Sequence, residues 1–119
     1  GVGRAMTDDA GGFRFRTVKP GAYRVPYEGR GSARGWWRPP HIHFSLFGPS
    51  FASRLVTQVY FPGEPLNARD LIMNSVRDPG ARRRLTLEYR PELDSEDGAL
   101  GFRVAFVLRG RFATPFEGR

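Results

Sequence analysis

The stretch His41-Ile42-His43-Phe44-Ser45-Leu46-Phe47 gives the clearest indication of how this chain folds. It is short and mostly apolar, and it lies between Pro39-Pro40 and Gly48-Pro49-Ser50, so it predicts a buried β-strand rather than a helix. Side chains two positions apart in a strand project from the same face, which places His41 and His43 side by side. The stretch therefore predicts a strand that carries two converging imidazoles.

Short apolar runs and turn residues extend this pattern through the rest of the chain. Four further segments predict strands, at residues 13–18, 55–61, 85–89 and 102–109. Residues 65–76 predict a helix that ends before Pro79-Gly80, and residues 22–35, rich in Gly, Pro and Arg, predict a long loop. We therefore expect an all-β fold, a β-sandwich of mostly antiparallel strands with long loops and one short helix.

The length of 119 residues, with 39% hydrophobic content, suits one domain over residues 1–119 and is too small for two. Cysteine is absent, so neither a disulfide nor a thiolate metal ligand is available. No segment is apolar for long enough to span a membrane and no signal segment opens the chain, so we expect a cytoplasmic protein. Because the first residue is Gly1 and not Met, we also expect that an N-terminal portion is missing.

The formal charge of +7 raises the question of a nucleic-acid or anionic membrane partner. Apart from Arg82-Arg83-Arg84, however, the basic residues are scattered singly among apolar ones, and Lys19 is the one lysine. A nucleic-acid surface would show a basic stripe interleaved with exposed aromatic residues. We therefore expect no nucleic-acid or membrane partner, and a small molecule as the ligand.

Two histidines on an apolar strand require polar partners, and a bound metal would provide one. For an arbitrary His-x-His, two histidines that merely fill a polar strand face are about as frequent as a metal site. Without cysteine, the further ligands must be oxygen donors, and Tyr23 lies in the loop that precedes the strand. A phenolate favours Fe(III), because a trivalent ion best offsets the cost of deprotonating the phenol. Spacing alone does not distinguish Tyr23 from Tyr27 or Tyr60.

Two further polar residues lie close to this strand in the sequence or in a neighbouring strand. Arg38 is three residues before His41, where a guanidinium would stabilise negative charge on a metal-bound substrate, although an ordinary ion-paired arginine is the simpler interpretation. Gln58 is a polar residue in an apolar strand, so it either serves the fold or orients the histidines or Arg38.

These motifs together resemble the intradiol ring-cleavage dioxygenase family, and most closely the iron-bearing β subunits of protocatechuate 3,4-dioxygenases. The most specific block is Trp37-Arg38-Pro39-Pro40-His41-Ile42-His43-Phe44. The likeness extends over nearly the whole chain, through the segments Thr7-Asp8-Asp9, 15–21, Gly48-Pro49-Ser50, 57–65, 102–110 and Phe116-Glu117.

The resemblance implies a β-sandwich that binds ferric iron through two tyrosinates, two histidines and a hydroxide. It implies that Tyr23, His41 and His43 are iron ligands, with Tyr23 leaving the iron as substrate binds and taking up a proton. Arg38 would stabilise charge during attack on O2, Gln58 would be its neighbour, and Arg38 with Trp37 would contact the substrate. The implied reaction cleaves protocatechuate or a related catechol between its hydroxylated carbons to a cis,cis-muconate-type dicarboxylate.

The chain departs from the family pattern before and after Tyr23. The family places its second tyrosinate several tens of residues earlier, where this chain has no tyrosine, which fits either a fragment or a relative with altered iron affinity. Val25 stands where protocatechuate enzymes typically have Trp, so the catechol stays open, and Arg30 or Arg34 could meet a substrate carboxylate.

The assembly implied by the resemblance is an oligomer with an α-type subunit. The α subunits of the family generally lack the His-x-His pair that this chain keeps. The alternative to an enzyme is therefore a non-catalytic or iron-poor structural subunit of the same kind of assembly.

Overall fold

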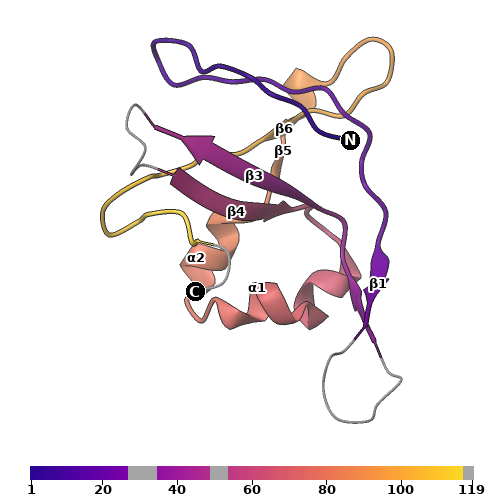
Figure 1. Ribbon diagram of the computed structural model, residues 1–119. Helices are drawn as coiled ribbons and strands as arrows, with labels where there is room; N and C mark the ends of the chain where they lie inside the picture. Colours follow the sequence, from indigo (N-terminus) through magenta and orange to yellow (C-terminus); the bar gives the residue numbers. More distant parts are fainter. Residues whose placement is uncertain (27–34, 49–53, 117–119) are drawn as a thin grey trace.

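The fold of the computed structural model, which describes residues 1–26, 35–48 and 54–116, is built from three two-stranded antiparallel sheets and short helices (Figure 1). The strands are β1 (Tyr23–Val25), β2 (Trp36–Arg38), β3 (His41–Phe47), β4 (Arg54–Tyr60), β5 (Glu88–Tyr89) and β6 (Phe102–Arg103). The helices are α1 (Leu71–Ser75) and α2 (Pro79–Arg84), with two 3-10 turns, η1 (Pro65–Arg69) and η2 (Pro91–Leu93). The sheets pair β1 with β2, β3 with β4, and β5 with β6.

The β3–β4 hairpin is the largest of these sheets, and its register defines two faces. His41 pairs with Tyr60 and His43 with Gln58, so these four side chains project from one face, the polar face. Ile42 and Phe44 of β3 and Val59 of β4 alternate with them and project from the other, the apolar face. The predicted strand at residues 41–47 is confirmed with the same bounds.

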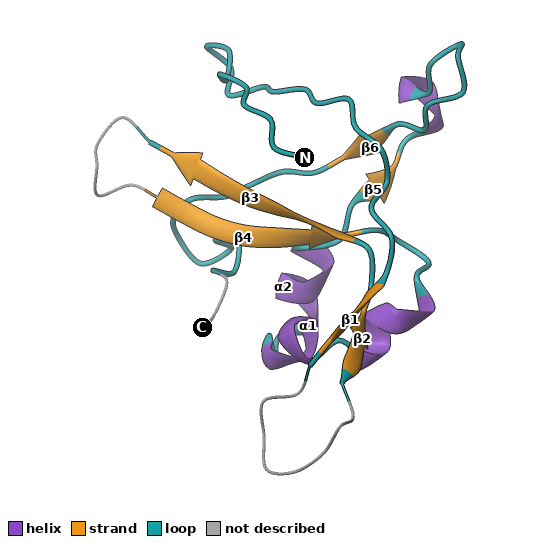
Figure 2. Cartoon of the chain, turned by 45° about the vertical axis from the view of Figure 1, so that its right-hand side comes forward, coloured by secondary structure: helices purple, strands orange, loops and turns teal. Residues whose placement is uncertain are grey.

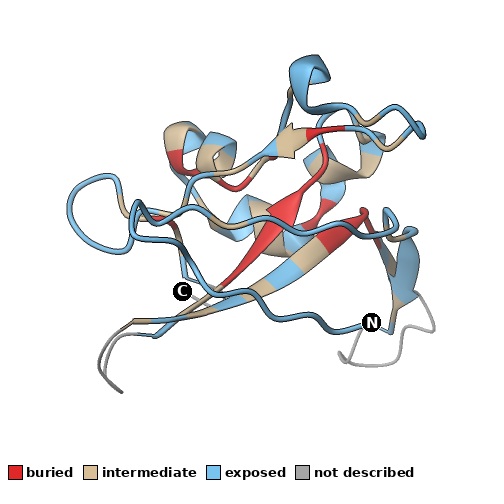
Figure 3. Cartoon of the chain, turned by 90° about the horizontal axis from the view of Figure 1, so that it is seen from above, coloured by how far each residue is buried: buried red, intermediate tan, exposed pale blue. Residues whose placement is uncertain are grey.

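The hydrophobic core lies on the apolar face. Val59, Phe61 and Leu87 are its buried centre, and half-buried side chains from β3, β6 and the segment after β6 pack around them. Phe44 and Phe106 place their ring centroids 4.9 Å apart, and Phe13 from the N-terminal segment stacks on Phe106 at 5.9 Å. Figure 3 shows the buried residues concentrated along β4 and at the start of β3.

The helices and the N-terminal segment lie on opposite sides of the hairpin. Figure 2 shows α1 and α2 on one side of β4, with the N-terminal segment and the β5–β6 sheet on the other. The two sides correspond to the two faces: Ile72 of α1 lines a cavity with Gln58 and Tyr60, whereas Phe13 packs on Phe44. Each face therefore has its own cover.

Two of the predicted strands are shorter in the structure and one is absent. Residues 13–18 form no strand, since they pair with no other strand among the described residues, although Phe13 still packs into the core. Of the strands predicted at residues 85–89 and 102–109, only the short pieces β5 and β6 pair with each other. Thr86 forms a single bridge to Tyr60. The alternation was right only in part about burial as well: Phe13, Phe102, Val104 and Phe106 are half-buried, whereas Phe15, Thr17 and Leu108 are exposed.

The predicted loop at residues 22–35 was partly wrong, because Tyr23–Val25 near its start form β1, and Trp36, directly after its end, begins β2. Tyr23 pairs with Arg38 and Val25 with Trp36, so β1 and β2 form one antiparallel ladder. Residues 27–34 lie outside the described part of the chain, so the predicted loop is not described between them.

The expectation of one helix was also wrong. The predicted helix at residues 65–76 is divided into η1 and α1 by Asp70, whose backbone is extended at φ −72° and ψ 120°. Pro79, expected to end a helix, instead begins α2, because proline needs no N–H at a first helical position and Asp78 accepts hydrogen bonds from Gly80 N and Ala81 N. The fold is nevertheless of the all-β kind, with short helices attached.

A membrane-spanning helix is not found in the part of the chain that the structure describes, where every helix is far shorter and more polar than such a span requires.

Candidate functional site

The site lies where β1, β2 and the start of β3 meet. β1–β2 pairing places Tyr23 directly opposite Arg38, and Pro39-Pro40 then lead the chain from β2 into β3. Because proline fixes φ, this link holds the end of β2 and the start of β3 in a defined relation. Three segments thus bring Tyr23, Arg38 and His41 together.

His41 is buried and its side chain is fixed by the backbone next to it. Its Nδ1 lies 2.8 Å from the carbonyl oxygen of Pro39, which can only accept a hydrogen bond. Nδ1 therefore carries the proton, and Nε2 presents its lone pair. Burial lowers the pKa of His41, the hydrogen bond to Pro39 raises it, and the positive charge of Arg38 lowers it again. The net effect is a lowered pKa, so the ring is neutral at pH 7.

Two further potential ligand atoms lie close to Nε2 of His41. Nε2 of His43 lies 3.2 Å away and the hydroxyl oxygen of Tyr23 lies 3.4 Å away. Two ligands that each lie about 2.1 Å from one ion, at about 90° to each other, are about 3 Å apart. Two imidazole nitrogens and a phenol oxygen therefore fit around a single ion.

The donor set also indicates which kind of metal fits. In the described ranges no group of three or more His, Asp or Glu side chains could hold a metal, so a third ligand would be the Tyr23 oxygen. A phenolate with two neutral imidazoles is a hard, anionic set that suits ferric iron better than zinc. The residues present fit the iron that the sequence predicts.

Tyr60, the tyrosine of the polar face, is not part of this donor set. Its hydroxyl lies 3.2 Å from Nη2 of Arg38, and its side chain is almost completely buried. Burial raises the pKa of Tyr60, and a hydrogen bond to Asp70 raises it further, so this phenol stays protonated. The structure thus separates Tyr23 from Tyr60, whereas Tyr27 lies outside the described residues.

Arg38 is 4% exposed and makes hydrogen bonds through all three nitrogens of its guanidinium. Nη1 lies 3.1 Å from Nε2 of His41, and Nη2 donates to Oε1 of Gln58 at 2.6 Å. Nε and Nη2 also donate to the two carboxylate oxygens of Asp70. Burial lowers the pKa of Arg38, but the hydrogen bond and charge of Asp70 outweigh it and the pKa is raised, so Arg38 remains a cation.

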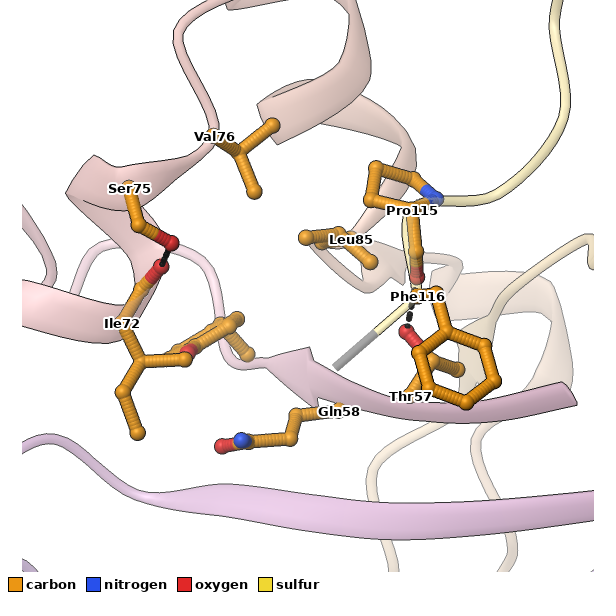
Figure 4. A pocket seen from close by; sticks show the side chains of 9 residues that line it. Thr57, Gln58, Ile72, Ser75, Val76, Leu85, Pro115 and Phe116 are labelled. Carbon is orange, nitrogen blue, oxygen red and sulfur yellow. Dashed lines mark hydrogen bonds between the residues drawn. The ribbon is translucent and has the colours of Figure 1, made fainter. Parts of the chain in front are cut away.

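Gln58 links Arg38 to a cavity on the polar face. Because arginine can only donate, the amide oxygen of Gln58 must face Arg38, which directs the amide nitrogen the other way. That nitrogen is buried and finds no hydrogen-bond partner within the described residues. Figure 4 shows Gln58 extending from β4 toward Ile72 in a cavity whose other walls include Val76, Leu85 and Phe116.

Of the remaining residues named by the sequence, Trp37 lies in β2 with 55% of its surface exposed. It pairs with Arg24 and therefore projects from the opposite face of β2 to Arg38. The structure consequently does not bring Trp37 into the cluster of Tyr23, His41 and His43. Arg30 and Arg34 lie outside the described residues.

Asp70 is the site residue that sequence reasoning missed. It is completely buried and lies thirty-two positions from Arg38, its partner. The sequence predicted one continuous helix over residues 65–76, which includes Asp70, and assigned Asp70 no role. One signal was available: a cation in an apolar setting such as Arg38 requires a buried acid, although sequence does not identify which one.

The chain is similar in sequence to several known proteins. A family model described as dioxygenase matches residues 1–110. The chain is 52% identical over 117 residues to the protocatechuate 3,4-dioxygenase beta chain of Burkholderia cepacia, covering 98% of this chain and 47% of the relative. It is 33% identical over 113 residues to the alpha chain of protocatechuate 3,4-dioxygenase from Pseudomonas putida, covering 94% of this chain and 51% of that one.

A third relative is similar over a shorter stretch. A chlorocatechol 1,2-dioxygenase of Pseudomonas putida is 42% identical over 67 residues, which cover 51% of this chain and 25% of the relative. The chain spans about half the length, or less, of the curated relatives it matches.

Proposed function

Because this chain belongs to the intradiol ring-cleavage dioxygenase family, we propose that it provides three iron ligands and the charge-stabilising arginine of an enzyme that cleaves catechols between their hydroxyls. The observation that carries the proposal is the convergence of Tyr23 Oη and His43 Nε2 on His41 Nε2, with Arg38 Nη1 beside them. The substrate class is protocatechuate or a related catechol, and O2 is the co-substrate.

The ligands would be Tyr23, His41 and His43. His41 is neutral, with its Nδ1 proton held by Pro39, so Nε2 can bind a cation without first losing a proton. When bound, ferric iron would supply a Lewis acid that draws electron density from the diol. With a second tyrosinate contributed from outside this chain, the ligand set would match that implied for the family.

The protein residues provide proton transfer and charge stabilisation. Tyr23 is 45% exposed, and its hydroxyl oxygen can take a proton from a diol hydroxyl when substrate arrives. Nη1 of Arg38 donates toward the same cluster, where it stabilises negative charge on the bound diol. In the overall reaction a ring carbon–carbon bond breaks and both atoms of O2 enter the dicarboxylate product.

Gln58 and Ile72 would border the diol on the polar face. Gln58 accepts a hydrogen bond from Arg38 and presents its amide nitrogen, which lacks a described partner, to the cavity beside Ile72. A buried donor of this kind favours a ligand that offers an oxygen acceptor. A catechol or its cleavage product offers several.

We extend the proposal to the assembly. The names of two relatives describe beta and alpha chains of one dioxygenase, which supports an oligomer that includes an α-type subunit. We also propose that the three small sheets are parts of a β-sandwich in the complete protein.

The test uses the protein that carries this chain, loaded with ferric iron. We expect broad visible absorption from phenolate-to-iron charge transfer, and ring cleavage that consumes one O2 per catechol. His43→Ala should lose both the iron and the activity. Ser45→Ala is the matched control, because Ser45 is exposed and two residues further along the same strand face. A wild-type protein without the absorption, or turnover retained in His43→Ala, would refute the assignment.

The role of Arg38 is tested separately from iron binding. Arg38→Lys keeps a cation beside Asp70 but lacks the planar fork, so we expect normal iron content and a loss of about 10²–10³-fold in kcat. Lysine is a better probe than alanine, which would leave the Asp70 charge buried and unpaired. Unchanged turnover in Arg38→Lys would reassign this residue to a structural role.

The alternative, a non-catalytic subunit, is distinguished by the same measurements. It predicts that the wild-type protein fails to bind iron at Tyr23, His41 and His43 although it assembles with its partner.

A further inference from the structure

Asp70 occupies a position that neither the ligand set nor substrate binding explains. It lies between η1 and α1, with no exposed surface, and its backbone carbonyl accepts the hydrogen bond of Asn74 N. A carboxylate without solvent requires a charged or multiply donating partner to offset its desolvation. Arg38, itself 4% exposed, is the charged partner, and the Tyr60 hydroxyl also bonds Asp70.

The contact between the two residues is bidentate. Arg38 Nε donates to Oδ1 of Asp70 at 3.2 Å and Nη2 donates to Oδ2 at 3.0 Å. This fork-to-fork arrangement occupies the Nε–Nη2 edge of the guanidinium. The same Nη2 also donates to Gln58 and Tyr60. The acceptors from Asp70, Gln58 and Tyr60 therefore all lie along the Nε–Nη2 edge.

The occupied edge determines where the remaining nitrogen points. A guanidinium is planar and rigid, so a fixed Nε–Nη2 edge fixes the direction of Nη1. Nη1 is the atom that lies 3.1 Å from His41 Nε2, where the Tyr23 oxygen and His43 Nε2 also converge. The Trp36 ring, 5.6 Å from the guanidinium carbon, covers one of its faces.

We propose that Asp70 is a positioning residue that aims Nη1 of Arg38 at the His41–His43–Tyr23 cluster. This inference rests on the proposed function for its catalytic consequence, since it assumes that Arg38 stabilises charge on a substrate bound there. Asp70 touches neither the potential ligand atoms nor the cavity beside Gln58 in the described contacts; it acts through Arg38.

A simpler role for Asp70 would be to anchor the η1–α1 segment to β2. The two roles differ in what fails when Asp70 changes. Loss of an anchor loosens the whole segment, whereas loss of a positioning contact alters the guanidinium while the segment stays in place. Asn67 offers the matched control, because it anchors the same segment through Nδ2 to the carbonyl of Phe61 at 2.8 Å and is not among the hydrogen-bond partners of Arg38 in the described residues.

The experiment compares Asp70→Asn, Asp70→Glu and Asn67→Ala in the iron-loaded protein that carries this chain. We expect Asp70→Asn to keep its iron and visible absorption, to keep KM within about twofold, and to lose about 10²-fold in kcat, since small misplacements of catalytic groups have effects of that size. Asn67→Ala should keep kcat. In an Arg38→Lys background, Asp70→Asn should cause little further loss, because the fork that Asp70 orients is already gone.

A second measurement does not depend on turnover. In the metal-free protein, the Nε–H resonance of Arg38 should exchange slowly and shift strongly on Asp70→Asn but stay in place in Asn67→Ala. If Asp70→Asn does not fold, Asp70→Glu keeps the charge, moves it by one methylene, and should give the same resonance shift with a smaller loss of kcat.

The outcomes separate this inference from the proposed function. An inactive, iron-free wild-type protein overturns the proposed function, while the Arg38 resonance still tests whether Asp70 sets the guanidinium. Full kcat in a folded Asp70→Asn or Asp70→Glu protein, or equal losses in Asn67→Ala, would overturn the positioning role.

Discussion

The two faces of the β3–β4 hairpin are held together in different ways. The apolar face, with Ile42, Phe44 and Val59, is covered by aromatic rings from three separate segments of the chain. The polar face is held by hydrogen bonds that Arg38 donates to Gln58 and to Tyr60. Apolar burial is non-directional and tolerates adjustment, whereas buried polar groups require partners at defined angles. The hairpin thus uses one face to fold and the other to orient chemical groups.

The largest effect should come from removing a buried ring on the apolar face. Phe61→Ala deletes a side chain that is 4% exposed and meets Phe102 edge to face at 5.4 Å, so we expect the free energy of unfolding to fall by about 3–5 kcal/mol. Urea unfolding measures it. Phe47→Ala, at the exposed end of β3, should change stability little, and equal losses in the two variants would contradict the division into faces.

A smaller effect is expected from one hydroxyl on the polar face. Tyr60→Phe keeps the ring but removes the oxygen that Arg38 Nη2 approaches at 3.2 Å, which we expect to lower the free energy of unfolding by about 1–3 kcal/mol. The matched variant Tyr89→Phe removes an exposed hydroxyl bonded to Asp94 and should cost much less in the same denaturant experiment. If the two variants unfold at the same denaturant concentration, the polar network contributes little stability.

A still smaller effect tests how the C-terminal segment is attached to β4. Thr57→Val removes the hydrogen bond from Oγ1 to the carbonyl of Pro115 at 2.7 Å, and we expect a loss of about 0.5–1.5 kcal/mol in thermal or urea unfolding. Thr17→Val is the exposed control, since its hydroxyl bonds the neighbouring carbonyl of Val18. Faster proteolysis of the C-terminal segment in Thr57→Val alone would support the attachment, and identical behaviour of both variants would argue against it.

The smallest effect lies outside both faces, at the exposed cap of α2. The hydrogen bond from Gly80 N, and next in size the one from Ala81 N, lower the pKa of Asp78 below its ordinary value of 3.8. The stability that its charge contributes is therefore present above pH 3.8 and is lost as the pH falls through the lower folded pKa. Asp78→Asn keeps a capping oxygen without the charge, so wild type should be slightly more stable at pH 7 and equal in strong acid. A difference in stability independent of pH would exclude this explanation.

Much of the hairpin was predictable because its pattern is local. The alternation in residues 41–47 and 55–61 placed His41 and His43 on one face and the apolar residues on the other, as the structure shows. The same alternation overestimated the strands near Phe13 and Phe106, whose rings pack into the core without strand pairing. Burial follows from side-chain pattern, but pairing also requires a neighbouring strand.

The sequence by itself determined the His-x-His pair, the nearby arginine and the absence of thiolate ligands, since these depend on residue type and on the period of a strand. Only the tertiary structure decided that the Tyr23 hydroxyl lies beside Nε2 of His41 while the Tyr60 hydroxyl bonds Arg38, and that Asp70 holds Arg38. Both results depend on contacts between segments distant in sequence, namely β1 with β2 and the η1–α1 junction with β2. Such contacts arise from packing and from the need to pair buried charges, which no local period encodes.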